Sequence, residues 1–185
     1  YIQVEFFIDF ITNFINQEIY LVDAYDIIIE VFSIFKRFSS FYLFNNKNMT
    51  RFCFSLEKMF SFFKSQKCYS KQIKIYYILT VTLSNFIYNY NDNSIINYIL
   101  DTKKDNISNV KFVFYKNELG RLITRSVIRM NYNILIIKSQ KALTDIEKSY
   151  CSRTLNYGSK ILSLMFTEKD NYYMNSLTRN QYPEY

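Results

Sequence analysis

Apolar residues recur along this chain at the three- and four-residue spacing of amphipathic helices. The segments with this spacing are 4–16, 18–38, 51–65, 94–100, 117–130 and 144–168. The last of them opens on the capping box T-D-I-E, in which Thr144 and Glu147 satisfy each other's backbone N–H groups at a helix start. The pattern predicts a mainly α chain.

One segment, 74–91, is apolar on every side of its predicted helix. It has no charged residue between Lys74 and Asp92. A helix of this kind either spans a membrane or forms the centre of a domain. Its threonines, asparagines and tyrosines are too numerous for lipid, so we expect no membrane insertion. We expect the hydroxyl groups to bond neighbouring backbone or water. The sequence predicts a compact multi-helix bundle, or a HEAT-like helical array, around 74–91.

Two short runs inside 110–138 fit a strand as well as a buried helix turn. These runs, VKFVFY at 110–115 and NILIIK at 133–138, are rich in β-branched and aromatic residues. If both are strands, they form a small two-strand element around the 117–130 helix. If both are helix turns, the chain is helical throughout this region.

The polar run 45–48 predicts a loop before the third helix, with Asn48 or Thr50 as its cap. A single domain is expected over 1–170, and an irregular tail over 171–185. The chain begins with Tyr1, which is expected if it was processed or lacks its original N-terminus.

The composition is typical of a protein encoded by an AT-rich genome, such as that of a parasite, an endosymbiont, an organelle or certain viruses. The chain has 18 Tyr and 18 Phe but only two Gly, one Pro and no His or Trp. This bias explains most of the aromatic residues as core fillers. The three cysteines show no C-x-x-C spacing, so we expect free thiols in a reducing intracellular compartment, the cytoplasm or an organelle matrix.

The same composition argues against an enzyme. Without histidine, catalytic triads and the usual zinc sites cannot form. Two glycines 38 residues apart cannot build a Walker or Rossmann phosphate loop, since each needs several glycines close together. We therefore expect no catalytic residues, no metal and no cofactor.

Charge is distributed unevenly along the chain, with a net value of +7 and a pI near 9.2. Every charged residue up to Glu30 is acidic, whereas Glu57 is the one acid between 31 and 90, against nine basic residues. A second basic stretch covers 121–160. The basic surplus favours an acidic partner such as RNA.

The most specific pattern is a stripe of three arginines, Arg121, Arg125 and Arg129, beside the apolar face of the 117–130 helix. The chain has seven Arg against sixteen Lys, and bidentate recognition of phosphate is a role in which Lys cannot replace Arg. The residues predicted to contact RNA phosphates are Arg121, Arg125, Arg129, Lys138, Lys141, Lys148, Arg153 and Lys160. The alternative is a solvated face that pairs with acidic residues of the N-terminal helices.

The sequence thus predicts a non-catalytic helical protein that docks on a larger assembly. The leading hypothesis is a ribosome-associated or RNA-associated factor, because the basic surfaces fit an RNA but the surplus is smaller than in most core ribosomal proteins. The alternative hypothesis is a parasite or viral adaptor that binds protein partners within a complex, without nucleic acid.

Overall fold

The computed structural model describes residues 9–10, 12–17, 25–38, 46–65, 67–88 and 118–165. Almost all of these residues are helical, which confirms the mainly α prediction. After a short helical stretch at 12–16, the bounded helices are α2 (Tyr25–Phe38), α3 (Asn46–Ser65), α4 (Tyr69–Tyr88), α6 (Glu118–Gln140) and α7 (Asp145–Met165).

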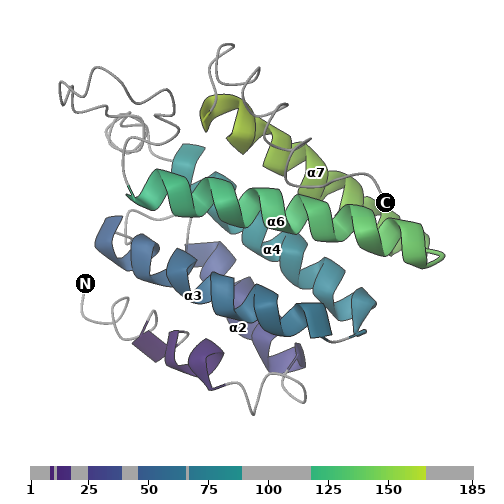
Figure 1. Ribbon diagram of the computed structural model, residues 1–185, viewed down its shortest axis with the longest axis horizontal. Helices are drawn as coiled ribbons and strands as arrows, with labels where there is room; N and C mark the ends of the chain where they lie inside the picture. The colour runs from purple at the N-terminus through teal and green to yellow at the C-terminus, as the bar shows by residue number, and fades with distance from the viewer. Residues whose placement is uncertain are drawn as a thin grey trace.

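The helices form two layers (Figure 1). In one layer α4 packs between α2 and α7, and in the other α3 packs against α6. α6 also packs on α4 and α7, which joins the layers. Segments far apart in the sequence are thereby brought together, and the contact of α3 with α6 is the one that builds the candidate site.

α4 is the central helix that the sequence predicts. It begins at Tyr69, five residues before the predicted start, and its buried side chains cover most of its circumference. Leu79 and Phe86 are fully buried. Its threonines are satisfied within the helix, because Thr80 and Thr82 donate to the backbone oxygens of the fourth residue before each, at 2.8 and 2.9 Å.

Aromatic side chains fill the space between α2, α3 and α4. Phe52 contacts both Phe32 and Phe35, and Tyr76 lies against Phe60 and Phe63. This is the core filling expected from the composition. The amide of Gln72 crosses the same region, donating to the hydroxyl of Tyr25 at 3.3 Å and to the backbone oxygen of Phe63 at 3.1 Å. The buried amide nitrogen of Gln72 therefore has two hydrogen-bond acceptors.

The structure corrects two local predictions. Residues 133–138 are helical, so a strand there is wrong; α6 continues through them because Met130, Ile134 and Ile137 are buried at helical spacing. Residues 46–48 belong to α3, so the predicted loop is too long; Asn48 is buried beside Met49 and belongs to the inward face. The predictions for 4–8, 94–100, 110–115 and 166–185, which include the tail 171–185, lie outside the described residues.

Candidate nucleic-acid interface

Two of the three arginines of α6, Arg125 and Arg129, contact α3. Burial of Leu122, Ile123 and Val127 fixes the rotation of α6, which leaves Arg121 and Arg125 exposed and Arg129 only 28% exposed. The helix thus presents its three arginines along one edge, as the spacing predicts. Their surroundings differ, and those differences decide which of them is open to a ligand.

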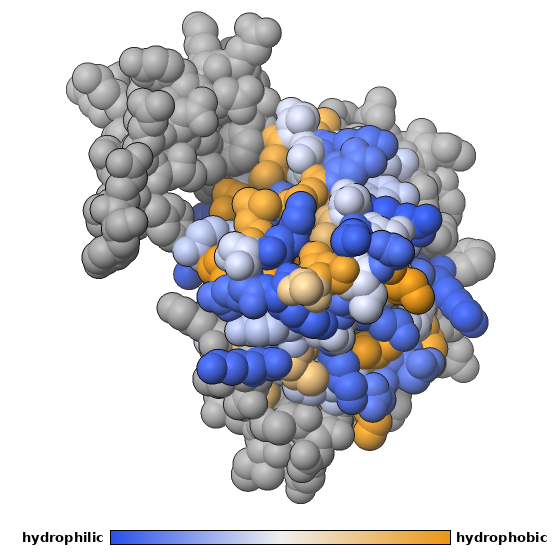
Figure 2. Space-filling model, turned by 90° about the vertical axis from the view of Figure 1, so that its right-hand side faces the viewer, coloured by the Kyte–Doolittle hydropathy of each residue, from blue (hydrophilic) through white to orange (hydrophobic). Residues whose placement is uncertain are grey.

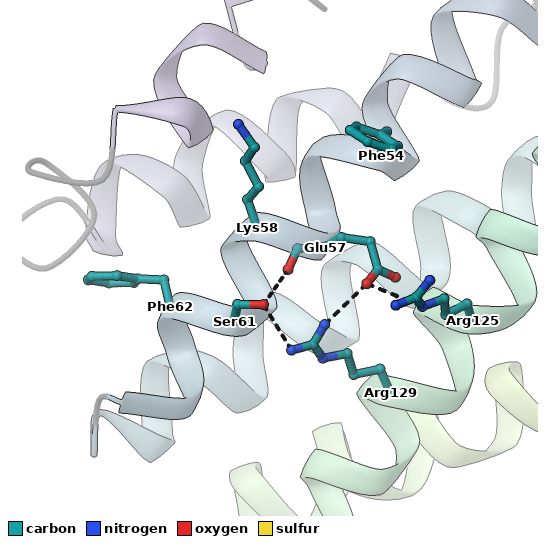
Figure 3. Close-up of a pocket in the computed structure, with 7 residues that line it drawn as sticks. All are labelled: Phe54, Glu57, Lys58, Ser61, Phe62, Arg125 and Arg129. Atoms are coloured by element: carbon teal, nitrogen blue, oxygen red, sulfur yellow. Dashed lines mark hydrogen bonds and ion pairs between the residues drawn. The ribbon is translucent and has the colours of Figure 1, made fainter.

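Arg129 is held by α3 on several sides (Figure 3). One of its terminal nitrogens is 3.2 Å from Oε2 of Glu57, and the other donates to Oγ of Ser61 at 3.1 Å. Its guanidinium also lies over the ring of Phe60, 5.8 Å from the centroid. Ser61 in turn donates to the backbone oxygen of Glu57 at 3.0 Å. Arg129 therefore joins α6 to α3 and is a structural residue first.

Arg125 is held more loosely by the same carboxylate. Its Nε lies 3.4 Å from Oε2 of Glu57, while 69% of the side chain is exposed. Glu57 itself is only 18% exposed, so it provides a fixed point for the guanidinium. Contact through Nε leaves the two terminal nitrogens without a partner among the described residues, and these are the donors that bind an oxyanion in bidentate fashion.

An open depression of about 560 Å³ surrounds these groups. It is lined by Phe54, Glu57, Lys58, Ser61, Phe62, Arg125 and Arg129. The lining thus holds three cationic residues and one carboxylate, and Arg125 and Arg129 both contact that carboxylate. Phe54 is 60% exposed and supplies an aromatic ring to the wall, beside the cations. The arrangement provides both phosphate donors and a surface on which a base can stack.

Charge is concentrated on this pair of helices. α3 and α6 each carry four basic residues and one acidic residue. The acidic N-terminal region bonds elsewhere: Asp9 pairs with Arg51 and Asp26 with Lys71. In the described part of the chain, the arginine stripe meets Glu57 in place of those N-terminal acids.

The remaining predicted phosphate contacts are divided between other parts of the surface. Lys138 is exposed near the end of α6. Lys141 donates to Glu147 at 2.6 Å and to Ser70 at 2.7 Å, so it clamps the connection between α6 and α7. Lys148 pairs with Asp145 within α7. Arg153 and Lys160 are exposed on α7, in the other layer. The eight predicted residues therefore do not form one continuous surface.

Sequence reasoning did not identify the α3 side of the depression, formed by Phe54, Glu57 and Lys58. Glu57 precedes Arg125 by 68 residues, and no local pattern reveals that pairing. A signal for Phe54 was nevertheless present. It lies in the polar stripe of α3 with Arg51 and Lys58, at three- and four-residue spacing, where an aromatic residue is exposed.

Other chemistry in the described residues is limited. Cys53, Cys68 and Cys151 are free, and burial raises the pKa of the Cys53 thiol to about 12, so it stays protonated. Among the described residues, no group of three or more metal-binding side chains comes together, and no helix is apolar over enough of its length to cross a membrane. Figure 2 shows the right-hand side of Figure 1, the side on which α6 ends. On this face, hydrophobic residues form small patches between hydrophilic ones.

Fold and site together define a mainly helical two-layer protein with a basic, aromatic-lined depression between α3 and α6. Comparison with protein-family models, curated proteins and solved structures finds no match. The function is therefore argued from the residues of the depression.

Proposed function

We propose that this protein is a non-catalytic, RNA-associated helical factor that docks on a ribonucleoprotein assembly such as the ribosome through the α3–α6 depression. The observation that supports this most is the state of Arg125, which Glu57 contacts through Nε while 69% of the side chain stays exposed. A guanidinium oriented before binding loses less entropy when it grips a phosphate. Lys58 and Arg129 add positive charge to the same wall.

The aromatic lining gives the second part of the argument. An isolated basic face attracts any polyanion, but Phe54, which is 60% exposed, provides apolar, planar surface in the same depression as the cations, and the partly buried Phe62 also lines it. Phosphate contacts position a nucleic acid, and stacked bases add affinity that is tolerant of sequence. Unpaired RNA offers both groups together, whereas the phosphates of a duplex are presented without free base faces.

The test measures fluorescence anisotropy of a labelled single-stranded RNA of mixed sequence over a series of salt concentrations. Replacing Arg121 and Arg125 by alanine is expected to weaken binding and to reduce the slope of log affinity against log salt by about 0.7 per lost phosphate contact. Lys47→Ala, which removes one exposed charge from the start of α3, is the control and should change the affinity much less.

A double Arg→Lys variant at the same two positions keeps the charge but removes the planar fork. If the site grips phosphates in bidentate fashion, this variant binds less tightly than the parent protein. Equal binding by parent and double alanine variant would refute the proposal. Partners that stay bound in a lysate after ribonuclease treatment, with no RNA affinity in the purified protein, would support the protein-binding adaptor in its place.

A further inference from the structure

A second surface lies on the other layer, along the contact between α4 and α7. The partly exposed residues of α4 that fall on one stripe are Lys74, Tyr77, Val81, Asn85 and Tyr88. On α7 a parallel stripe contains Tyr150, Arg153, Tyr157 and Lys160. Both stripes follow the three- and four-residue spacing of one helix face. We refer to Tyr77, Tyr88, Tyr150 and Tyr157 as the tyrosine seam.

Two contacts join the stripes. The rings of Tyr77 and Tyr150 are stacked, with centroids 4.9 Å apart and planes 25° apart. Further along, the hydroxyl of Tyr88 donates to the backbone oxygen of Lys160 at 2.9 Å. Tyr150 and Tyr157 are two helical turns apart, or about 10.5 Å along the axis. One end of the seam therefore has a stacked pair of rings, and at the other end Tyr88 is fixed to the backbone of α7.

Cations lie next to the rings. The ammonium of Lys160 is 5.8 Å from the centroid of the Tyr157 ring, and that of Lys36 is 5.8 Å from the Tyr77 ring. Arg153 lies between Tyr150 and Tyr157 on the exposed face of α7. α4 contains no acidic residue, and α7 contains none after Glu147. In the described part of α4 and α7, the seam thus combines aromatic surface with positive charge, and these two helices place no acidic residue on it.

Among the eight tyrosines of the described residues, Tyr25 and Tyr76 are buried in the core. Tyr88 differs from these two, because it is 44% exposed, and Tyr150 and Tyr157 are partly exposed. Stacking of bases on aromatic rings contributes affinity that tolerates any sequence in proteins that bind single strands. Such binding needs unpaired bases, so a duplex does not fit this surface equally well.

We propose that the tyrosine seam is a second contact for single-stranded RNA, in which Tyr88 and Tyr157 stack on bases while Arg153 and Lys160 contact the adjoining phosphates. This rests on the proposed RNA-associated function and adds to it a separate contact on the opposite layer. A strand that reaches both surfaces gains affinity from each of them.

The experiment compares the affinities of a labelled single-stranded 20-mer and of a duplex of the same length for four variants of the whole chain. Tyr157→Leu is expected to weaken binding of the single strand by about fivefold or more, the lower bound of one lost stacked base. Tyr157→Phe keeps the ring and should bind as the parent does. Tyr69→Leu, the same change at the start of α4, where the Tyr69 hydroxyl bonds Gln140 away from both surfaces, is the matched control and should leave affinity unchanged. Arg153→Ala, the fourth variant, should reduce the salt slope by about 0.7.

Several outcomes separate this inference from the proposal on α3 and α6. If the Arg121 and Arg125 variants lose affinity while Tyr157→Leu and Arg153→Ala do not, the seam is refuted and the α3–α6 site stands. Equal losses for single strand and duplex at Tyr157 would refute stacking. Absence of RNA binding by the parent protein would refute both, as would affinity for anionic phosphatidylserine vesicles alone. Circular dichroism melting of each variant confirms that Tyr157→Leu is folded, and Arg153→Ala tests the seam independently of it.

Discussion

Neutralising Glu147 should weaken the junction between α4, α6 and α7. The carboxylate is only 10% exposed and accepts from the ammonium of Lys141 at 2.6 Å and from the backbone N–H of Thr144 at 2.9 Å. The N–H of Glu147 donates in return to Oγ1 of Thr144 at 3.3 Å, which completes the capping box. Lys141 also bonds Ser70, at the start of α4.

These contacts hold the pKa of Glu147 at about 2, well below the usual 4.5; the hydrogen bond from Lys141 is the largest cause, followed by those of Ser70 and Thr144. Because the pKa is lower in the folded chain, ionised Glu147 stabilises the fold above about pH 4.5, and this stabilisation is lost as pH falls toward 2. The difference of about 2.5 pKa units sets an upper limit of about 3 kcal/mol at neutral pH.

Glu147→Gln is the sharpest perturbation, because glutamine still accepts the Thr144 hydrogen bond but carries no charge. We expect a loss of about 1–3 kcal/mol near pH 7, or about 2–4 °C in melting temperature for each kcal/mol in a chain of this size. Denaturation followed by circular dichroism at about pH 7, pH 4 and pH 3 measures it. The difference between parent and variant should shrink as the pH falls.

Asp145→Asn is the control, since that carboxylate is 96% exposed and pairs only with Lys148 in the same turn. Its effect at neutral pH should stay below about 1 kcal/mol. A loss at Glu147→Gln that is the same at all three pH values would show that ionisation of this carboxylate does not stabilise the fold. Lys141→Met should remove the same pH dependence, and the double variant should lose less than the sum of the two.

Two further predictions concern packing. Gly158→Ala should destabilise the fold, because a β-carbon there would lie 2.5 Å from Oδ1 of Asn131 on α6. The loss of stability should be smaller in an Asn131→Ala background, as thermal melting of the single and double variants would show. Equal losses in both backgrounds would contradict the steric explanation. Leu79→Ala should cost about 2–5 kcal/mol in denaturant unfolding, since Leu79 is fully buried in α4, and a loss below about 1 kcal/mol would mean that α4 is not the centre of the core.

The helices and the central position of α4 could be predicted because periodicity and hydroxyl content are local properties of a sequence. The capping box at Thr144 was predictable for the same reason, and the structure forms it with both reciprocal hydrogen bonds. Residues 133–138 show where this reasoning reaches its limit. Their β-branched residues favour a strand, but burial of Ile134 and Ile137 against the rest of the bundle outweighs that preference.

The environment of the arginines could not be predicted, because it depends on which helix lies opposite α6. Spacing alone places Arg121, Arg125 and Arg129 in equivalent positions, yet α3 makes them unequal by placing Glu57 between two of them. Arg129 becomes a link between helices, and Arg125 becomes an oriented donor at the edge of a depression. The use of arginine on α6, in a chain where arginine is scarce, therefore has two physical explanations. A planar guanidinium suits both a carboxylate inside the fold and a phosphate outside it. The Arg→Lys variants separate them: at Arg129 the change should lower stability, and at Arg125 it should lower RNA affinity while leaving stability nearly unchanged.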